Sequence, residues 1–318
     1  MTGRTGIRRT DVAGAAGHAD HPPRVGFFTD TSVCIGCKAC EVACKEWNAV
    51  PDDGFDLLGM SFDNTGELGA NSWRHVAFVE QPLALDDREP GFAGLPTGPS
   101  SSSLRNGEVR DLGMPGFARP GDATGAESRT DFRWLMASDV CKHCTHAGCL
   151  DVCPTGALFR TEFGTVVVQQ DICNGCGYCV SGCPYGVIDR RPQDGRAQKC
   201  TLCYDRLRGG LEPACAKACP TDSIQFGELD ELRERADRRV AQLHEQGVTE
   251  ARLYGRDPDD GVGGDGAFFL LLDEPEVYGL PPDPVVTTRD LPHMYKRAVA
   301  AACAMLAGAV LSFVGRRG

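Results

Sequence analysis

The sequence predicts an α+β protein assembled from small repeated units, and three observations support that expectation. Seventeen cysteines occur in the 318 residues, and sixteen of them lie in four compact segments. Short strand patterns and turn residues follow these segments, so that a loop, a short helix and a small strand recur along the chain, as in an internal duplication. An uncharged apolar segment near the C-terminus predicts one long helix outside the repeats.

The chain begins with residues 1–24, which we predict to be a flexible tail. Arg8 and Arg9 lie in this tail, but no apolar segment follows them, so we expect no cleavable export signal. Residues 73–80 alternate between apolar and polar side chains, which predicts a strand. Residues 90–130 are rich in Pro, Gly and Ser, and this composition is typical of a surface insertion or linker.

Further elements are expected after the insertion. Residues 156–159 and 165–169 predict the two strands of a short hairpin, and residues 186–189 lead into a similar turn-rich unit. Residues 228–246 place apolar side chains at helical spacing, which predicts a charged amphipathic helix. The apolar run at residues 267–272 predicts a buried strand that closes a small accessory region.

The composition excludes several classes of protein. The formal net charge is −11 and no basic stripe is visible, so we expect no binding to nucleic acid and look instead to proteins or redox groups as partners. No G-x-G-x-x-G follows a strand, and neither a P-loop nor a G-x-S-x-G motif occurs. The GVGG at residues 261–264 is interpreted as a loop. We therefore predict no catalytic residue in this chain.

The spacing of the cysteines indicates iron–sulfur clusters. A [4Fe–4S] cluster needs four thiolates, and a C-x2-C-x2-C loop supplies three of them, while in two-cluster ferredoxins the fourth cysteine of each motif ligates the other cluster. The sequence therefore predicts four [4Fe–4S] clusters in units that exchange a ligand. The four motifs are Cys34, Cys37, Cys40 and Cys44; Cys141, Cys144, Cys149 and Cys153; Cys173, Cys176, Cys179 and Cys183; and Cys200, Cys203, Cys215 and Cys219.

The residues around the motifs refine this interpretation. Pro154, Pro184 and Pro220 follow the last cysteine of three motifs, as the ferredoxin pattern expects, whereas Lys45 follows Cys44. Zinc is the alternative metal, because C-x2-C pairs also build zinc sites, but a zinc site needs no third cysteine two residues further on.

Three more side chains in or near these segments need an interpretation. His143 and His146 lie within the second motif, where four cysteines already satisfy a cluster, so we expect both to be supporting or surface groups. Cys303 has no companion cysteine and is expected to be a small buried apolar residue.

The apolar segment at residues 298–314 contains seventeen residues without a charge, between Lys296–Arg297 and Arg316–Arg317. As a helix it would be roughly 25 Å long, near the lower limit for crossing a bilayer. We expect a membrane anchor, and a buried core helix is the alternative. Gly308 and its small neighbours suit close packing on a partner helix.

These motifs resemble the iron–sulfur (beta) subunit of respiratory, membrane-bound formate dehydrogenase, over most of residues 26–317. The resemblance continues beyond the cysteines, through GVTEARLYG at residues 247–255 and DEPEVYGLP at residues 273–281. The most specific segments are CIGCKACEVACKEWN at 34–48, CKHCTHAGCLDVCPTGAL at 141–158, CNGCGYCVSGCPYGVI at 173–188 and KCTLCYDRLRGGLEPACAKACPTDSIQFG at 199–227.

The resemblance implies which motifs are paired and which partners the chain has. Electrons from a catalytic alpha subunit with a molybdenum or tungsten pterin would pass through this non-catalytic subunit to a membrane gamma subunit, a cytochrome b that reduces quinone. An equivalent relay subunit of another molybdopterin enzyme, acting on sulfur compounds or sulfoxides, is the alternative. The implied ligand sets are Cys34, Cys37, Cys40 and Cys219; Cys44, Cys200, Cys203 and Cys215; Cys141, Cys144, Cys149 and Cys183; and Cys153, Cys173, Cys176 and Cys179.

The resemblance also implies a single C-terminal transmembrane helix, with most of the chain outside the bilayer on a side that the sequence does not fix. The predicted fold is thus two ferredoxin-like dicluster units with loop-rich insertions and that helix. The predicted parts are the tail, 1–24; the first dicluster unit, 25–89 with 199–227; the insertion, 90–130; the second dicluster unit, 131–198; the accessory region, 228–290; and the anchor, 296–315.

Overall fold

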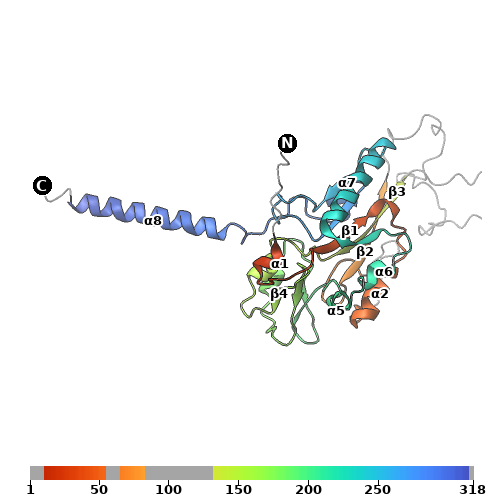
Figure 1. The fold of residues 1–318 in the computed structure, drawn as a ribbon, viewed down its shortest axis with the longest axis horizontal. Helices are drawn as coiled ribbons and strands as arrows, with labels where there is room; N and C mark the ends of the chain where they lie inside the picture. The colour runs from red at the N-terminus through yellow and green to blue at the C-terminus, as the bar shows by residue number, and fades with distance from the viewer. Residues whose placement is uncertain (1–10, 55–64, 83–131, 315–318) are drawn as a thin grey trace, which may run out of the picture. The chain divides into compact units, whose positions relative to one another are not determined.

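One strand from the N-terminal part of the chain and three from its C-terminal half form the largest sheet of the computed structural model, which describes residues 11–54, 65–82 and 132–314. Their order is β8 (Ile224–Glu228), β1 (Val25–Asp30), β10 (Ala267–Leu271) and β9 (Arg252–Tyr254). β1 pairs antiparallel with β8 and parallel with β10. The strand before the first cysteine motif therefore lies beside the strand that follows the fourth (Figure 1).

Helix α7 (Leu229–Glu245) covers one face of this sheet. Leu232 and Ala236 of the helix are buried with Phe28 of β1 and Phe268 of β10. The two phenylalanine rings stack with their centroids 5.3 Å apart. The predicted amphipathic helix at residues 228–246 is confirmed, because its apolar stripe is the side that packs on the sheet.

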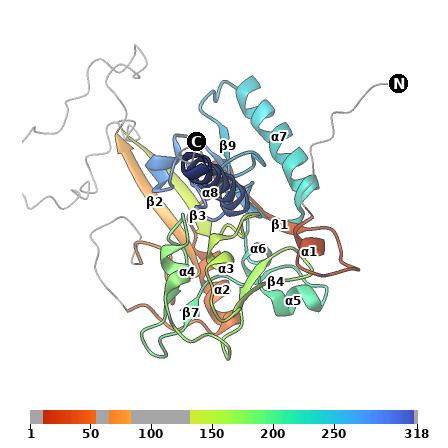
Figure 2. The same cartoon turned by 90° about the vertical axis from the view of Figure 1, so that its left-hand side faces the viewer.

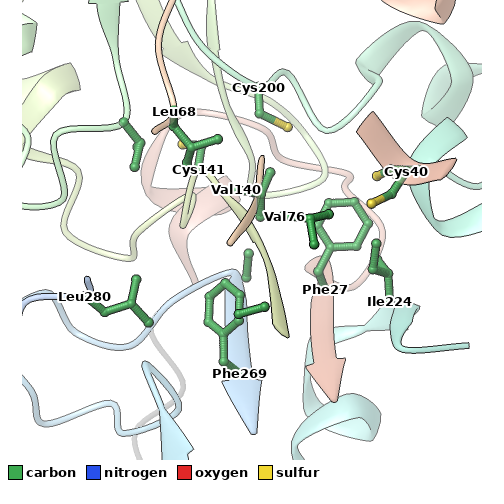
Figure 3. Packing of buried hydrophobic residues seen from close by; sticks show 14 of the residues in the cluster. Phe27, Cys40, Leu68, Val76, Val140, Cys141, Cys200, Ile224, Phe269 and Leu280 are labelled. Atoms are coloured by element: carbon green, nitrogen blue, oxygen red, sulfur yellow. The ribbon is translucent and has the colours of Figure 1, made fainter. Parts of the chain in front are cut away.

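The other face of the sheet packs against the cysteine motifs. Side chains alternate between the two faces of a strand, so Phe27 and Phe269 point away from α7 into a second apolar cluster. Figure 3 shows Phe27 and Ile224 beside Cys40, with Cys141 and Cys200 in the same cluster. The sheet thus forms the floor on which several cysteines rest.

A short helix follows each cysteine loop, and helices from two different motifs pack against each other. Helix α2 (Ala39–Asn48) of the first motif packs against α6 (Ala214–Lys217) of the fourth (Figure 1). Helix α3 (Gly148–Asp151) of the second motif packs against α4 (Tyr178–Ser181) of the third (Figure 2). A further short helix, α5 (Tyr204–Arg208), follows Cys203.

Three small two-stranded sheets complete the strand pairing in the described residues. The predicted hairpin is confirmed as β4 (Leu158–Arg160) and β5 (Val166–Val168), which pair antiparallel. The turn-rich unit after the third motif forms β6 (Asp189–Arg190) and β7 (Ala197–Gln198). The predicted strand at residues 73–80 is part of β2 (Arg74–Pro82), which pairs with β3 (Phe132–Val140).

The protein divides into two compact units, of which the smaller is Glu80–Trp134. Its described residues are the facing ends of β2 and β3, where Arg133 Nε donates a hydrogen bond to Gln81 Oε1 at 2.7 Å. The predicted insertion at residues 90–130 lies outside the described residues.

Strand β10 differs from the expectation for its region. It lies inside the main sheet, between β1 and β9, and all five of its residues are buried. Its sequence alone predicts a strand of an accessory region, because a parallel partner more than 230 residues away leaves no local signal. Residues 228–290 instead supply two strands, β9 and β10, and helix α7 to the core that supports the motifs.

Residues 11–24 also differ from the predicted flexible tail. Helix α1 (Val12–Ala15) is capped by Asp11, whose Oδ1 accepts a hydrogen bond from Gly14 N at 2.8 Å. Val12 and Ala13 are buried, and His18 Nε2 lies 3.0 Å from Arg160 O. Residues 1–10 of the predicted tail lie outside the described residues.

The C-terminal helix α8 (Leu291–Val314) is longer than the uncharged segment that predicted it. Its stretch His293–Phe313 is long and apolar enough to cross a bilayer, and within the described residues none of that stretch is buried. Cys303 is exposed, so the expectation that it is a buried side chain is wrong for the isolated protein.

Candidate metal-cluster sites

Set A consists of Cys34, Cys37, Cys40 and Cys219, which together line one pocket. Cys34 follows a 3-10 turn, Cys40 lies in α2, and Cys219 follows α6. Burial raises the pKa of the Cys34 thiol, and its neighbours Cys219 and Cys37 add to that shift. The structure therefore brings three cysteines of the first motif together with the last cysteine of the fourth.

The loop between Cys34 and Cys37 requires a glycine. Gly36 has a φ of 63°, in the left-handed region that favours glycine. A Cβ atom at this position would also lie 2.6 Å from Met136 Sδ and 2.7 Å from the ring of Phe78. Gly36 thus lets the cysteine loop turn tightly against β2 and β3.

Set B consists of Cys44, Cys200, Cys203 and Cys215, all four of which are buried. The Nδ2 atom of Asn48 lies 3.8 Å from Cys44 Sγ and 3.7 Å from Cys203 Sγ, so this amide joins the first motif to the fourth. Burial raises the pKa of Cys44 well above its usual value, and the thiolates of Cys200 and Cys215 raise it further. Set B thus contains the last cysteine of the first motif.

Set C consists of Cys141, Cys144, Cys149 and Cys183, which together line one pocket. Burial raises the pKa of Cys149 to about 12, against the nearby charge of Lys199. Burial is also the largest cause that raises the pKa of Cys144. The negative charges of Asp265, of Cys141 and of the other two cysteines of the set raise it further. Set C combines three cysteines of the second motif with the last of the third.

Set D consists of Cys153, Cys173, Cys176 and Cys179. Burial raises the pKa of Cys179 to about 11, and the thiolates of the other three cysteines contribute to the shift. The backbone N–H of Ala197 donates to Cys173 Sγ at 3.4 Å. Burial alone would raise the pKa of Cys153. Hydrogen bonds, among them those from the backbone of Leu158 and Thr155, outweigh burial and lower it.

The donor atoms of the four sets suit iron–sulfur clusters. Each set offers four sulfur atoms from cysteine, the donor type that [4Fe–4S] clusters use. The cysteines of sets A and C each line a single pocket. In the described parts of the chain, no three His, Cys, Asp or Glu side chains are grouped so as to hold a single metal ion. A cluster bound in such a set supplies one-electron redox chemistry.

Cysteines of different sets affect one another's pKa in three pairs of sets. The thiolate of Cys215 in set B adds to the effect of burial on the pKa of Cys40 in set A. In the same way, the thiolate of Cys141 in set C raises the pKa of Cys200 in set B. The thiolate of Cys179 in set D raises the pKa of Cys149 in set C. Sets A and B, sets B and C, and sets C and D are therefore neighbours.

Sequence reasoning missed three buried cations beside the cysteines: Arg74, Lys142 and Lys199. Burial alone would lower the pKa of Lys199, but the nearby thiolates of Cys141, Cys149 and Cys200 outweigh it and the pKa is raised. The same balance holds for Arg74, whose pKa is raised by Cys215, Cys40, Cys200 and Cys44. Lys142 and Lys199 directly follow or precede a motif cysteine, whereas no sequence pattern marks Arg74.

The two histidines of the second motif differ in their surroundings. His143 lines the set C pocket, is 2% exposed, and accepts a hydrogen bond at Nδ1 from Val166 N at 3.1 Å. Within the described residues its Nε2 has no hydrogen-bond partner. His146 is half-buried, and its backbone N–H bonds to Val262 O. Burial is the main cause that lowers the pKa of both rings, which favours their neutral form.

Lys45 explains why the first motif departs from the proline pattern. Helix α2 continues to Asn48, beyond Cys44, and a proline at position 45 would interrupt the helix. The Nζ atom of Lys45 donates to Asn71 O at 2.9 Å and to Pro51 O at 3.3 Å, and it also contacts Asp53. Lys45 therefore fixes the loops after α2, a role that proline could not fill.

Comparison with known proteins identifies cluster-binding domains in this chain. The family of 4Fe-4S dicluster domains matches residues 33–157 and, with a second profile, residues 132–229, so that the two ranges together contain all four motifs. Two such domains correspond to four [4Fe–4S] clusters.

Several curated proteins are similar over most of the chain. The nitrate-inducible formate dehydrogenase iron-sulfur subunit of Escherichia coli (strain K12) is 37% identical over 85% of this chain and 76% of its own length. The formate dehydrogenase-O iron-sulfur subunit of the same organism is 35% identical over 88% of this chain and 80% of its own. The B polypeptide of its anaerobic dimethyl sulfoxide reductase is 30% identical over 66% and 76%, respectively.

The relatives are electron-transfer subunits of oxidoreductase complexes, and none of the three is named as a catalytic subunit. The predicted absence of a catalytic centre and the predicted redox role agree with that assignment. On the identity and the coverage, the chain is a non-catalytic iron–sulfur electron-transfer protein that belongs to the family of formate dehydrogenase iron–sulfur subunits.

Proposed function

We propose that sets A to D each hold one [4Fe–4S] cluster and that the chain relays electrons along them between two partner subunits. The donor would be a catalytic subunit that oxidises formate at a molybdenum or tungsten pterin. The acceptor would be a membrane cytochrome b subunit that reduces quinone. The names of the relatives support formate as the source of electrons.

The adjacency of successive sets, A with B, B with C and C with D, is the observation that carries the proposal. The charge of Cys215 in set B acts on Cys40 in set A, that of Cys141 in set C on Cys200 in set B, and that of Cys179 in set D on Cys149 in set C. An electron would therefore move from A to D, or back, without leaving the chain. Among the sixteen cysteines, all in the described residues, only Cys37 and Cys176 are exposed. These two belong to the outer sets, where electrons would arrive and leave.

The surface near both outer sets suits protein partners. Ile35 lies between Cys34 and Cys37 and is 58% exposed, and Tyr178 lies between Cys176 and Cys179 and is 60% exposed. Exposed aromatic and aliphatic side chains are typical anchors of protein interfaces. We infer one docking surface at each end of the relay.

Helix α8 is the proposed membrane anchor. Its apolar stretch His293–Phe313 has 21 residues, which corresponds to about 32 Å as a helix, the thickness of the hydrocarbon core of a bilayer. Lys296 and Arg297 lie near its first turn, where long cationic side chains can reach the headgroups. The chain would be a single-pass protein of the cell membrane, with the cysteine sets outside the bilayer.

A relay in a sulfoxide or thiosulfate reductase is the second candidate, since the dimethyl sulfoxide reductase polypeptide is also a relative. That similarity covers 66% of this chain, against 85% and 88% for the two formate dehydrogenase subunits. The wider coverage favours formate dehydrogenase.

Anaerobic extraction of the membranes in detergent, followed by purification through a tag on this chain, tests the proposal. We expect a molybdopterin protein and a b-type cytochrome to co-purify, and formate to reduce the clusters of the complex as followed by electron paramagnetic resonance (EPR). Dimethyl sulfoxide and thiosulfate are the control substrates. The formate assignment would be refuted if formate left the clusters oxidised while either control substrate reoxidised them after chemical reduction.

A further inference from the structure

Arg74 is a charged side chain in the core of the protein. It lies at the start of β2, is 2% exposed, and packs its guanidinium against the ring of Phe27 at 4.9 Å from the centroid. A buried charge is costly unless a group of opposite charge or a set of hydrogen bonds compensates for it. The contacts of Arg74 therefore show which groups it serves.

These contacts lead to two cysteine sets. The Nη2 atom of Arg74 donates to Cys215 Sγ of set B at 3.2 Å. Its Nη1 atom donates to Ser138 Oγ at 3.2 Å and to Ser138 O at 3.1 Å. Ser138 Oγ lies in turn 3.2 Å from Cys40 Sγ of set A. One guanidinium thus reaches set B directly and set A through a single hydroxyl group.

The direction of these hydrogen bonds follows from the chemistry of the atoms. Arginine only donates, so the hydroxyl oxygen of Ser138 accepts from Nη1, and its own hydrogen is free to point at Cys40. A thiolate bound to iron has no hydrogen and can only accept. The sequence Arg74 to Ser138 to Cys40 is therefore a consistent chain of donors that ends on a sulfur ligand.

The charge of this cation is balanced by sulfur. Among the ion pairs of residues 11–54, 65–82 and 132–314, none includes Arg74. The buried negative charge near its guanidinium is therefore that of the thiolates of sets A and B. Cluster reduction adds one more negative charge at the same place, and an adjacent cation in a medium of low dielectric constant stabilises it.

We propose that Arg74, with Ser138, is a positioning residue for electron transfer that raises the reduction potentials of the clusters in sets A and B and so favours the electron at that end of the relay. Hydrogen bonds to the sulfur ligands and net charge are among the factors that set cluster potentials. The effect is larger at set B, because its N–H to sulfur contact is direct and charge-assisted. This inference rests on the proposed function in one respect, namely that both sets hold clusters.

The variant Arg74→Gln removes the charge and keeps a polar side chain. In the full-length chain, purified anaerobically with its clusters, an EPR-monitored potentiometric titration follows the four one-electron transitions. We expect two transitions to move to lower potential and the other two to stay in place. At set B the ratio of reduced to oxidised cluster should fall at least tenfold at a fixed potential, which is a shift of about 59 mV.

Three companion variants separate a potential effect from a structural one. Arg74→Lys keeps the charge, so the transitions of both sets should stay close to their wild-type potentials. Ser138→Ala removes only the hydroxyl relay and should lower the set A transition more than the set B transition. Arg191→Gln is the matched control, because Arg191 is a half-buried arginine bonded to Asn71 Oδ1 and Ala70 O and should shift no transition.

The iron and sulfide content of each sample distinguishes the two levels of failure. A wild-type chain without iron would refute the proposed function itself. An Arg74→Gln chain with full iron content and all four transitions unchanged would overturn the role of Arg74 and leave the relay function intact. If Arg74→Gln assembles no clusters, Ser138→Ala decides, and a fully loaded Ser138→Ala chain with unchanged transitions would overturn the proposal.

Discussion

The two inner cysteine sets differ from the two outer ones in how the protein encloses them. All four cysteines of set B are buried, whereas sets A and D each contain one exposed cysteine, Cys37 and Cys176. Lys199 lies between sets B and C with its amino group hydrogen-bonded to Cys200 O at 2.9 Å. In the described residues, the pKa of Cys179 in set D is raised by burial and other thiolates with no cation among its causes.

This difference separates two tasks of a relay. An outer cluster has to come close to a partner protein, so part of its surroundings must stay open. An inner cluster exchanges electrons only within the chain, and its potential depends on the charges that the core places beside it. We therefore expect changes at the inner sets to alter the clusters themselves, and changes at the outer surface to alter the exchange with partners.

Loss of a cysteine should have the largest effect, and two neighbouring cysteines of one motif make a matched pair. Cys215→Ser should disturb the cluster of set B, and Cys219→Ser that of set A, although the two residues are close to each other in and just after the same short helix. Each variant should lose up to about four of sixteen iron atoms. Iron analysis and EPR of the purified variants would contradict the ligand exchange if both variants affected the same cluster.

Removal of the inner cation should have the next largest effect. Lys199→Met keeps most of the side-chain volume and removes the positive charge near Cys141, Cys149 and Cys200. The potentials of the clusters in sets B and C should fall, because a reduced cluster loses a nearby cation. We expect a change of about tenfold in the ratio of reduced to oxidised cluster, or about 59 mV.

An EPR titration of the Lys199→Met chain measures this shift, and the transition of set D is the internal reference. A shift of potential confined to sets A and D would contradict the expectation that Lys199 acts on the inner sets.

Substitutions on the surface near the outer sets should leave the clusters intact and slow electron exchange with the partner proteins. Ile35→Ser and Tyr178→Ser each remove one exposed apolar side chain beside an outer set. A side chain at the centre of an interface typically contributes about 1–3 kcal/mol to binding. We expect a decrease of about tenfold in the rate of electron exchange with one partner each, measured in the purified complex by stopped-flow spectroscopy.

The control for these variants is Val285→Ser, since Val285 is 54% exposed and belongs to the loop that contacts Gly261. It should leave both rates unchanged. If Val285→Ser slowed exchange as much as Ile35→Ser and Tyr178→Ser do, the two docking surfaces would be refuted.

Truncation of α8 should have the smallest effect on the clusters. A chain that ends at residue 290 lacks the candidate membrane span, whose described side chains make no contribution to the buried core. It should leave the membrane fraction and keep all four EPR signals with unchanged potentials. Sedimentation of membranes and an EPR titration check both statements, and lost clusters would show that α8 supports the sets.

Several features of the fold could be predicted because their signals are local. The hairpin of β4 and β5 follows from apolar runs around a turn, and α7 from its periodic leucines. The motif spacing alone identified all sixteen cysteines as candidate ligands, and the resemblance to a family supplied their pairing. Lys45 departs visibly from the proline pattern, but the reason for it, the longer helix α2, needed the structure.

Other features depend on contacts between distant residues and left no pattern in the sequence. The parallel pairing of β1 with β10 joins residues more than 230 positions apart, so the sequence of β10 predicted only an accessory region. Arg74 and Ser138 come from two paired strands and meet Cys215 and Cys40 only in the folded protein. The burial expected for Cys303 was inferred from its apolar segment, but Cys303 is exposed on α8.

The location of the iron atoms tests the central claim most directly. Anomalous diffraction at the iron edge, from crystals of the full chain or its complex grown without oxygen, reveals each cluster and the cysteines around it. We predict four clusters in the order A, B, C, D, with Cys219 beside Cys34 and with Cys44 beside Cys203. Clusters that each took all four cysteines from a single motif, or metal centres without iron, would contradict it.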